Sequence, residues 1–300
     1  MATPNTLLNV ERVSRRRPIT RPIGWEGFWL RYGNTITLVI NFSIFFVLWE
    51  VVAQSGRVSH LILAPVSDII GETVKLIQSG QLAYHVSFSF KNFAAGYLIS
   101  VVVGIPLGLA LGASKTLDRI LGPYMWALFS TPRLALLPLI TVAIGFGWES
   151  KVLLIFLAAV FMIIMNTWAG VKTVDASLIR AAKVFGANRI QIFTQVVVPF
   201  TMPFIAEGLR MGVTRAIVTA LVAEMIASSA GMGYLMMRAV DSFNTAQMFA
   251  MILILVIFSV SVVALMRRLE AKLAPWRGVG SVKAEKGGCG EIIPNLVPSA

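Results

Sequence analysis

Long apolar runs separated by short polar segments dominate this chain. Six of these runs are long enough to cross a bilayer, which takes about 20 apolar residues of helix. We expect spanning helices at about 34–53, 92–113, 121–146, 152–171, 202–227 and 247–266. The pattern therefore predicts an all-α membrane protein with six transmembrane helices.

The predicted spans divide the chain into three parts. A basic N-terminal tail (1–32) precedes a transmembrane domain (33–275), and a C-terminal tail (276–300) has the composition of a disordered segment. Between the first two spans, residues 55–89 should lie outside, with 68–76 as a short amphipathic stretch on the membrane surface.

Glycine and proline inside the predicted spans indicate where helices pack closely and where one of them breaks. Gly108 and Gly112 are four residues apart and form a face of small residues, which favours close contact with another helix. Pro132 should break the third span near its middle.

Composition supports the membrane assignment. Hydrophobic residues make up 57% of the chain and charged residues only 13%, whereas a soluble domain carries about 25% charged residues. The net charge of +12 could indicate a nucleic-acid partner, but 18 of the 26 Lys and Arg residues fall on one side of the predicted spans and five on the other. The positive-inside rule then accounts for the charge, predicts no nucleic-acid partner, and places both termini and the longest loop between spans in the cytoplasm.

The sequence gives little support for catalysis or metal binding. Cys289 is the one cysteine, His60 and His85 are far apart, and the predicted spans contain no His and no Asp. There is no Gly-rich phosphate loop followed by Lys and Ser or Thr, so we expect no cofactor and no ATP site in this chain. A membrane-embedded enzyme and a passive channel remain the alternatives to a transport subunit.

The polar loop at about 172–200 has helix signals of its own. The side chains at 175–177 can cap a short helix over 178–185, and Gly186 permits the left-handed turn that ends it. Asn188 can cap a second helix over 189–196.

Two prolines at the end of this loop and two alanines beside its turn indicate how the loop could end and what it could contact. Pro199 and Pro203 should stop the second helix before the next span. Ala181 and Ala182, beside the turn, would let another protein approach the backbone closely. The residues alone leave two readings open: a docking surface, or a merely solvated helical loop.

The spacing of this loop matches a known pattern. Ala181-Ala182, three residues, Gly186, nine residues, Val196, one residue, then Val198-Pro199 resembles the signature ("EAA") loop of the membrane subunits of bacterial ABC importers. Arg180 stands where that family has its leading Glu. The resemblance implies an ABC importer permease fold in the bacterial inner membrane, with a coupling helix that fits a cleft of a cytoplasmic ATPase.

Other motifs extend the resemblance over about 60–270 and narrow it to permeases for sulfonates, taurine and nitrate. They include Leu63-Ala64-Pro65, Gly104-Ile105-Pro106-Leu107-Gly108, Gly145-Phe146-Gly147, Gly208-Leu209-Arg210, Ala223-Glu224-Met225 and Gly231-Met232-Gly233-Tyr234. What this implies is a homodimer, two ATPase subunits that bind ATP, and an extracellular or periplasmic substrate-binding protein. The solute would be a small molecule with negatively charged oxygens, such as a sulfonate, taurine, nitrate or bicarbonate.

Charged residues inside spans are the candidates for a translocation path, because each costs about 2.5–3.5 kcal/mol at a helix centre. Glu207 and Arg210 are three residues apart and should form a structural ion pair. Arg133, Arg215 and Glu224 remain as path candidates. Arg215 and Glu224 are nine residues apart and so lie on opposite faces of one helix. The alternative is that these groups bond carbonyls or one another and hold the bundle together.

Overall fold

The computed structural model describes the backbone of residues 25–273 and the side chains of residues 36–268. The described residues contain helices and no strands. The elements are α1 (Trp25–Gln54), α2 (Val66–Gln78), α3 (Gln81–Ala113), α4 (Lys115–Ser130), η1 (Arg133–Leu136), α5 (Leu137–Ile144), α6 (Trp148–Lys172), α7 (Ala176–Val184), α8 (Arg189–Ile192), the π-turn η2 (Phe193–Val197), α9 (Val198–Ala227), α10 (Met232–Asp241) and α11 (Thr245–Leu273). The predicted tails lie largely outside the described residues.

The chain divides into two compact units between Ser67 and Asp68. In the first unit, the carboxylate of Glu50 in α1 accepts a hydrogen bond from the backbone N–H of Val66 (2.6 Å) and another from Oγ of Ser67 (2.8 Å). The indole N–H of Trp49 donates to the carbonyl of Ala64 (2.9 Å). These bonds tie the connecting loop to the end of α1.

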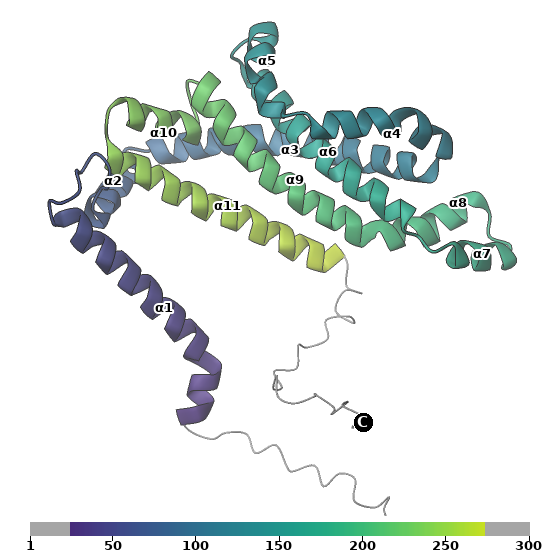
Figure 1. The fold of residues 1–300 in the computed structure, drawn as a ribbon, viewed down its shortest axis with the longest axis horizontal. Helices are drawn as coiled ribbons and strands as arrows, with labels where there is room; N and C mark the ends of the chain where they lie inside the picture. The colour runs from purple at the N-terminus through teal and green to yellow at the C-terminus, as the bar shows by residue number, and fades with distance from the viewer. Residues whose placement is uncertain (1–24, 274–300) are drawn as a thin grey trace, which may run out of the picture. The chain divides into compact units, whose positions relative to one another are not determined.

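The core of the second unit is formed by α3, α6 and α9, which pack along one another, with α11 beside α9 (Figure 1). Glycines of α3 face β-branched side chains of α6. A Cβ at Gly108 would lie 2.7 Å from Cβ of Thr167, and one at Gly104 would lie 3.0 Å from Cβ of Ile163. The predicted close helix contact is confirmed, and side chains larger than hydrogen are excluded from this face of α3.

Five described helices are long and apolar enough to span a membrane, and a bent pair of helices supplies a sixth span. That pair, 115–130 and 133–144, is bent by 83°. The break lies at Thr131 and Pro132, whose extended backbone follows from the missing N–H of proline and its clash with the preceding residue. The predicted break of the third span at Pro132 is confirmed, and the bent pair begins six residues before the predicted start at 121.

The second span begins earlier than the hydropathy pattern indicated. Helix α3 starts at Gln81 and not near residue 92, so His85 and Ser89 lie inside a candidate span. This candidate span thus includes a histidine that the predicted span over 92–113 did not contain. These polar residues are buried against α10, which is why an apolar pattern did not detect this part of the helix.

The amphipathic stretch at 68–76 is helical, as part of α2. Part of its apolar side packs on the protein: Leu76 is buried in a cluster with Met232, Leu235 and Met251 of α10 and α11. Ile70 and Ile77, by contrast, are each 59% exposed, so only part of the apolar side is covered by the protein.

Pro199 and Pro203 do not stop the helix that follows the loop. Helix α8 continues through the π-turn into α9, where Val198 N–H bonds to the carbonyl of Phe193, five residues earlier. Pro199 lies two residues after the π-turn, where the regular bonding pattern of the helix is already interrupted, and Pro203 lies inside α9. The π-turn takes up the change in register that the prolines require.

Candidate functional site

The polar loop between α6 and α9 is a firmly capped pair of short helices. The carboxylate of Asp175 accepts a hydrogen bond from the backbone N–H of Ser177 (2.7 Å), which caps α7 and lowers the pKa of Asp175. Asn188 and Gln191 form a reciprocal capping box at α8, with both N–H···O distances at 2.8 Å. The helix predictions for this loop are confirmed to within two residues at the start of α7, whereas the second helix joins α9.

Gly186 makes the turn between α7 and α8 with a φ of 79°. The N–H of Ala187 bonds to the carbonyl of Ala182 and the N–H of Gly186 to that of Lys183, both at 3.0 Å, which is the Schellman arrangement. A residue with a side chain is strained at this φ, although the space around Gly186 is open.

The two faces of the loop differ sharply. The inner face packs on a cluster of Val171, Ile192 and Val197, and Ala182 belongs to this face. The outer face exposes apolar side chains that lie outside this cluster: Leu178, Val184, Phe185 and Ile190. Phe185 is 90% exposed and Val184 is 84% exposed.

This outer apolar surface, called here the loop patch (Leu178, Val184, Phe185 and Ile190), has a basic border. Arg180, Lys183 and Arg189 are exposed around it, and so is Ala181. An exposed apolar patch with a charged rim is typical of a protein–protein contact. Of the two small residues named from the sequence, Ala181 is exposed and Ala182 is partly buried.

Arg133 and Arg215 lie near each other on separate elements, η1 and α9. The guanidinium of Arg133 donates to the carbonyl of Phe129 (2.8 Å) and lies over the rings of Phe129 (5.6 Å) and Phe161 (5.0 Å). Arg215 is exposed on α9 and is close enough to Arg133 for the two charges to repel. The structure thus gives Arg133 local partners and leaves two cations on one side of the bundle.

Glu224 lies on the other side of α9, in the protein interior. It is 1% exposed, and its Oε2 accepts from Oγ of Ser89 (2.6 Å) and from the N–H of Gly233 (3.2 Å). The amide of the buried Asn92 lies beside this carboxylate, although Nδ2 of Asn92 and Oε1 of Glu224 make no hydrogen bond of ordinary geometry. Glu224 therefore holds helices together at this end and does not line an open surface.

Sequence reasoning missed the residues that surround Glu224. His85 Nδ1 accepts from the N–H of Gly231 (2.9 Å), and Oγ of Ser89 accepts from the N–H of Met232 (2.8 Å). Three successive amides at the start of α10, those of Gly231, Met232 and Gly233, are thus bonded by side chains of α3 and α9. The glycines at 231 and 233 were the available signal, since a Cβ at either would overlap Glu224.

The remaining predicted pair, Glu207 and Arg210, has Nη1 of Arg210 3.3 Å from Oε2 of Glu207. Both side chains are about one-third exposed, at 36% for Glu207 and 31% for Arg210. Among the described residues, no group of three or more His, Cys, Asp or Glu side chains could hold a metal ion.

Comparison with known proteins agrees with this geometry. Residues 101–275 match the family described as "Binding-protein-dependent transport system inner membrane component". The chain belongs to this family. It is a transmembrane permease subunit of a binding-protein-dependent ABC importer.

Two relatives show how far the similarity extends. The taurine transport system permease protein TauC of Escherichia coli is 31% identical over 280 residues, which is 91% of this chain and 97% of TauC. SsuC of Bacillus subtilis, provisionally described as an aliphatic sulfonates transport permease protein, is 33% identical over 247 residues, 82% of this chain and 89% of SsuC.

A solved structure shows the same fold. It is a chain of the MetNI methionine ABC transporter in an inward-facing conformation, with a TM-score of 0.55 and 18% identity over 65% of this chain and 94% of that chain. The ABC importer permease fold predicted from the sequence is confirmed.

Proposed function

We propose that the loop patch is the surface through which this permease couples to a separate ATPase subunit. The observation that carries the proposal is the 90% exposure of Phe185 on a loop whose backbone is fixed by two caps and a Schellman turn. A rigid loop with an exposed apolar tip can transmit a movement of a bound partner to the spans, whereas a flexible loop would deform instead. ATP would be bound by that partner.

The family to which the chain belongs indicates its partner subunits. Membership implies an ATPase and a substrate-binding protein as partners. We place the loop patch and both termini in the cytoplasm, because most Lys and Arg residues lie on that side of the spans. We expect a second copy of this chain to complete the translocation path, with the binding protein on the outer face.

The solute in this proposal is a small molecule with an anionic group, such as a sulfonate or taurine, with nitrate and bicarbonate as further candidates. Two observations favour it: the neighbouring cations Arg133 and Arg215, and the sulfonate and taurine permeases among the relatives. A pair of fixed positive charges in a low-dielectric path attracts anions and repels cations.

Co-purification with the ATPase encoded beside this chain tests the coupling surface. We expect the wild type to carry the ATPase through affinity purification and Gly186→Val to lose most of it, because valine is strained at a φ of 79°. Phe185→Ala should also weaken the complex, since it removes the most exposed part of the patch without disturbing buried residues.

A matched control separates docking from general damage. Gly80 has a φ of 72° and open space around it, like Gly186, but lies between α2 and α3 at the other end of α3 from the loop. Gly80→Val should therefore leave ATPase association unchanged. Equal loss in Gly80→Val and Gly186→Val, or no association of the wild type, would contradict the proposal.

A further inference from the structure

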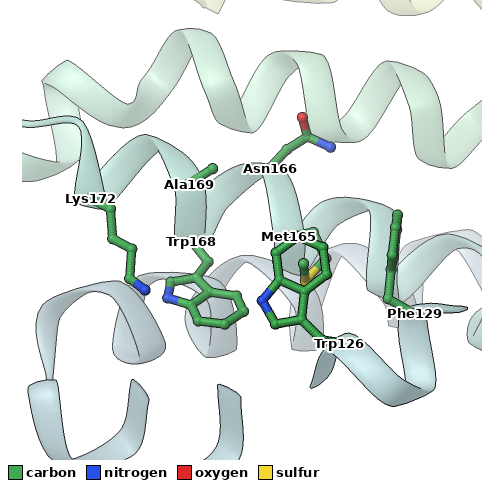
Figure 2. Close-up of a pocket in the computed structure, with 7 residues that line it drawn as sticks. All are labelled: Trp126, Phe129, Met165, Asn166, Trp168, Ala169 and Lys172. Carbon is green, nitrogen blue, oxygen red and sulfur yellow. The ribbon is translucent and has the colours of Figure 1, made fainter. Parts of the chain in front are cut away.

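A pocket of about 230 Å³ lies between α4 and α6 (Figure 2). Its lining includes four large, mainly apolar side chains, those of Trp126, Phe129, Met165 and Trp168. Its volume is below the roughly 300 Å³ at which pockets for drug-sized ligands begin, so it suits a small organic molecule.

Two hydrogen-bond donors meet at one end of this pocket. Trp168 is 4% exposed, and its buried Nε1 has no acceptor among the described residues. The ammonium of Lys172 lies 4.5 Å from the centre of the Trp168 ring, and Figure 2 shows the two nitrogens at the same end of the pocket. A buried N–H without an acceptor is costly, so this end of the pocket favours a ligand with an anionic oxygen.

Lys172 is partly neutralised by the protein itself. Its Nζ lies 2.7 Å from Oδ1 of Asp118 in α4. An ammonium carries three donors, so this ion pair leaves two for a ligand. The Asp118 carboxylate also competes with any anion that approaches.

The pocket continues the side of the bundle that carries the two arginines. Phe129 lines the pocket and also lies under the guanidinium of Arg133. Nδ2 of Asn166, another lining residue, lies 3.8 Å from Sδ of Met211, one helical turn before Arg215 on α9. From Arg133 the pocket leads to Lys172, the last residue of α6 before the coupling loop.

We propose that this pocket binds a small organic anion on the cytoplasmic half of the translocation path. The indoles of Trp126 and Trp168 would enclose the apolar body of the ligand, and Lys172 Nζ with Trp168 Nε1 would hold its anionic group. The proposal rests on the proposed function, since it assigns a resting place to the solute of that permease. The same chemistry is present in an anionic phospholipid, and the experiment separates the two sources.

The test is quenching of tryptophan fluorescence by 2-bromoethanesulfonate, with the ATPase complex in nanodiscs of neutral phosphatidylcholine. We expect saturable quenching by the sulfonate and only linear, unsaturable quenching by the neutral 2-bromoethanol. Trp168→Phe should raise Kd by about tenfold, because it removes the indole donor and keeps an aromatic wall. Trp148→Phe, at the opposite end of α6, is the matched control and should leave Kd unchanged.

Substitutions of the ion pair should act in opposite directions. Lys172→Met removes a donor and should weaken binding, with recovery in Lys172→Arg. Asp118→Asn removes the competing carboxylate and should tighten binding. A purely structural role for the pair would make both Lys172→Met and Asp118→Asn harmful.

The outcomes separate this proposal from the one on which it rests. Saturable quenching that is insensitive to Trp168 and Lys172, in a complex that still contains its ATPase, would overturn the pocket and leave the coupling function standing. Saturable quenching lost when phosphatidylglycerol replaces part of the neutral lipid would assign the pocket to lipid and also overturn the proposal. Failure of the ATPase complex to form would overturn the proposed function, and with it the pocket proposal that rests on it.

Discussion

Ser89 of α3 donates a hydrogen bond of 2.6 Å from its Oγ to Oε2 of Glu224 of α9, 135 residues further along the chain. The same hydroxyl accepts from the N–H of Met232, and the same carboxylate oxygen accepts from the N–H of Gly233. Two side chains thus join α3, α9 and the start of α10. A buried carboxylate at a helix N-terminus also interacts favourably with the helix dipole.

Glu224→Ala should destabilise the bundle and loosen α10. The substitution leaves the N–H of Gly233 without its acceptor in the interior, at a cost of about 2 kcal/mol in the free energy of unfolding. Hydrogen exchange should speed up at the amides of Gly231, Met232 and Gly233. Glu149→Ala, which removes an exposed carboxylate at the start of α6, should cost less than about 1 kcal/mol in stability and leave this exchange unchanged.

Arg215→Gln should impair anion transport while ATPase docking survives. Arg215 is exposed on α9 near Arg133, so its loss halves the positive charge at that point without opening the core. We expect uptake of a sulfonate by reconstituted complex to fall by about tenfold. Unchanged uptake by a variant that still binds the ATPase would contradict the proposal that Arg215 lines a path for anions.

Gly108→Ala should lower the thermal stability of the protein in detergent. The added Cβ would lie 2.7 Å from Cβ of Thr167 and 2.9 Å from the carbonyl oxygen of Ile164, so α3 and α6 must move apart. Overpacking of this kind costs about 1–3 kcal/mol. Gly71→Ala, in α2 with open space around it, should be neutral or slightly stabilising, and equal losses at both positions would refute the close contact.

Asp175→Ala should fray the first turn of α7 and speed hydrogen exchange there, whereas Asp175→Asn should keep the cap. The pKa of Asp175 is lowered in the folded protein by its bond to the Ser177 N–H, so the ionised side chain stabilises α7 above the ordinary Asp pKa of about 3.9. That contribution is lost as pH falls through the lower folded pKa. Exchange in α7 that is equally sensitive to acid in Asp175→Asn would show that another group is responsible.

The polar loop at 172–200 could be predicted closely because its signals are local. Asp175, Gly186 and Asn188 act on backbone groups within three residues of themselves, so one stretch of sequence contains the whole argument. The exception was Pro199, where a π-turn in the preceding residues cancelled the stop signal.

The cluster around Glu224 could not be predicted from the sequence. Its members lie on α3, α9 and α10, and only tertiary packing brings His85 to Gly231 or Ser89 to Met232. Likewise, the sequence marked Arg133 and Arg215 as costly charges but could not show that they approach each other across two elements. The pocket beside Trp168 depends on the packing of α4 against α6 and has no local signal.

The most direct test of the account is a site-specific crosslink from the loop patch. Cys289 is the one cysteine in the chain, so Phe185→Cys in a Cys289→Ser background offers a single thiol at the tip of the patch. Val142→Cys, an equally exposed position on α5 towards the opposite end of the spans, is the control. We predict that a thiol-reactive crosslinker joins residue 185, and not residue 142, to the ATPase. ATPase that co-purifies but crosslinks at neither position, or equally at both, would contradict coupling through this loop.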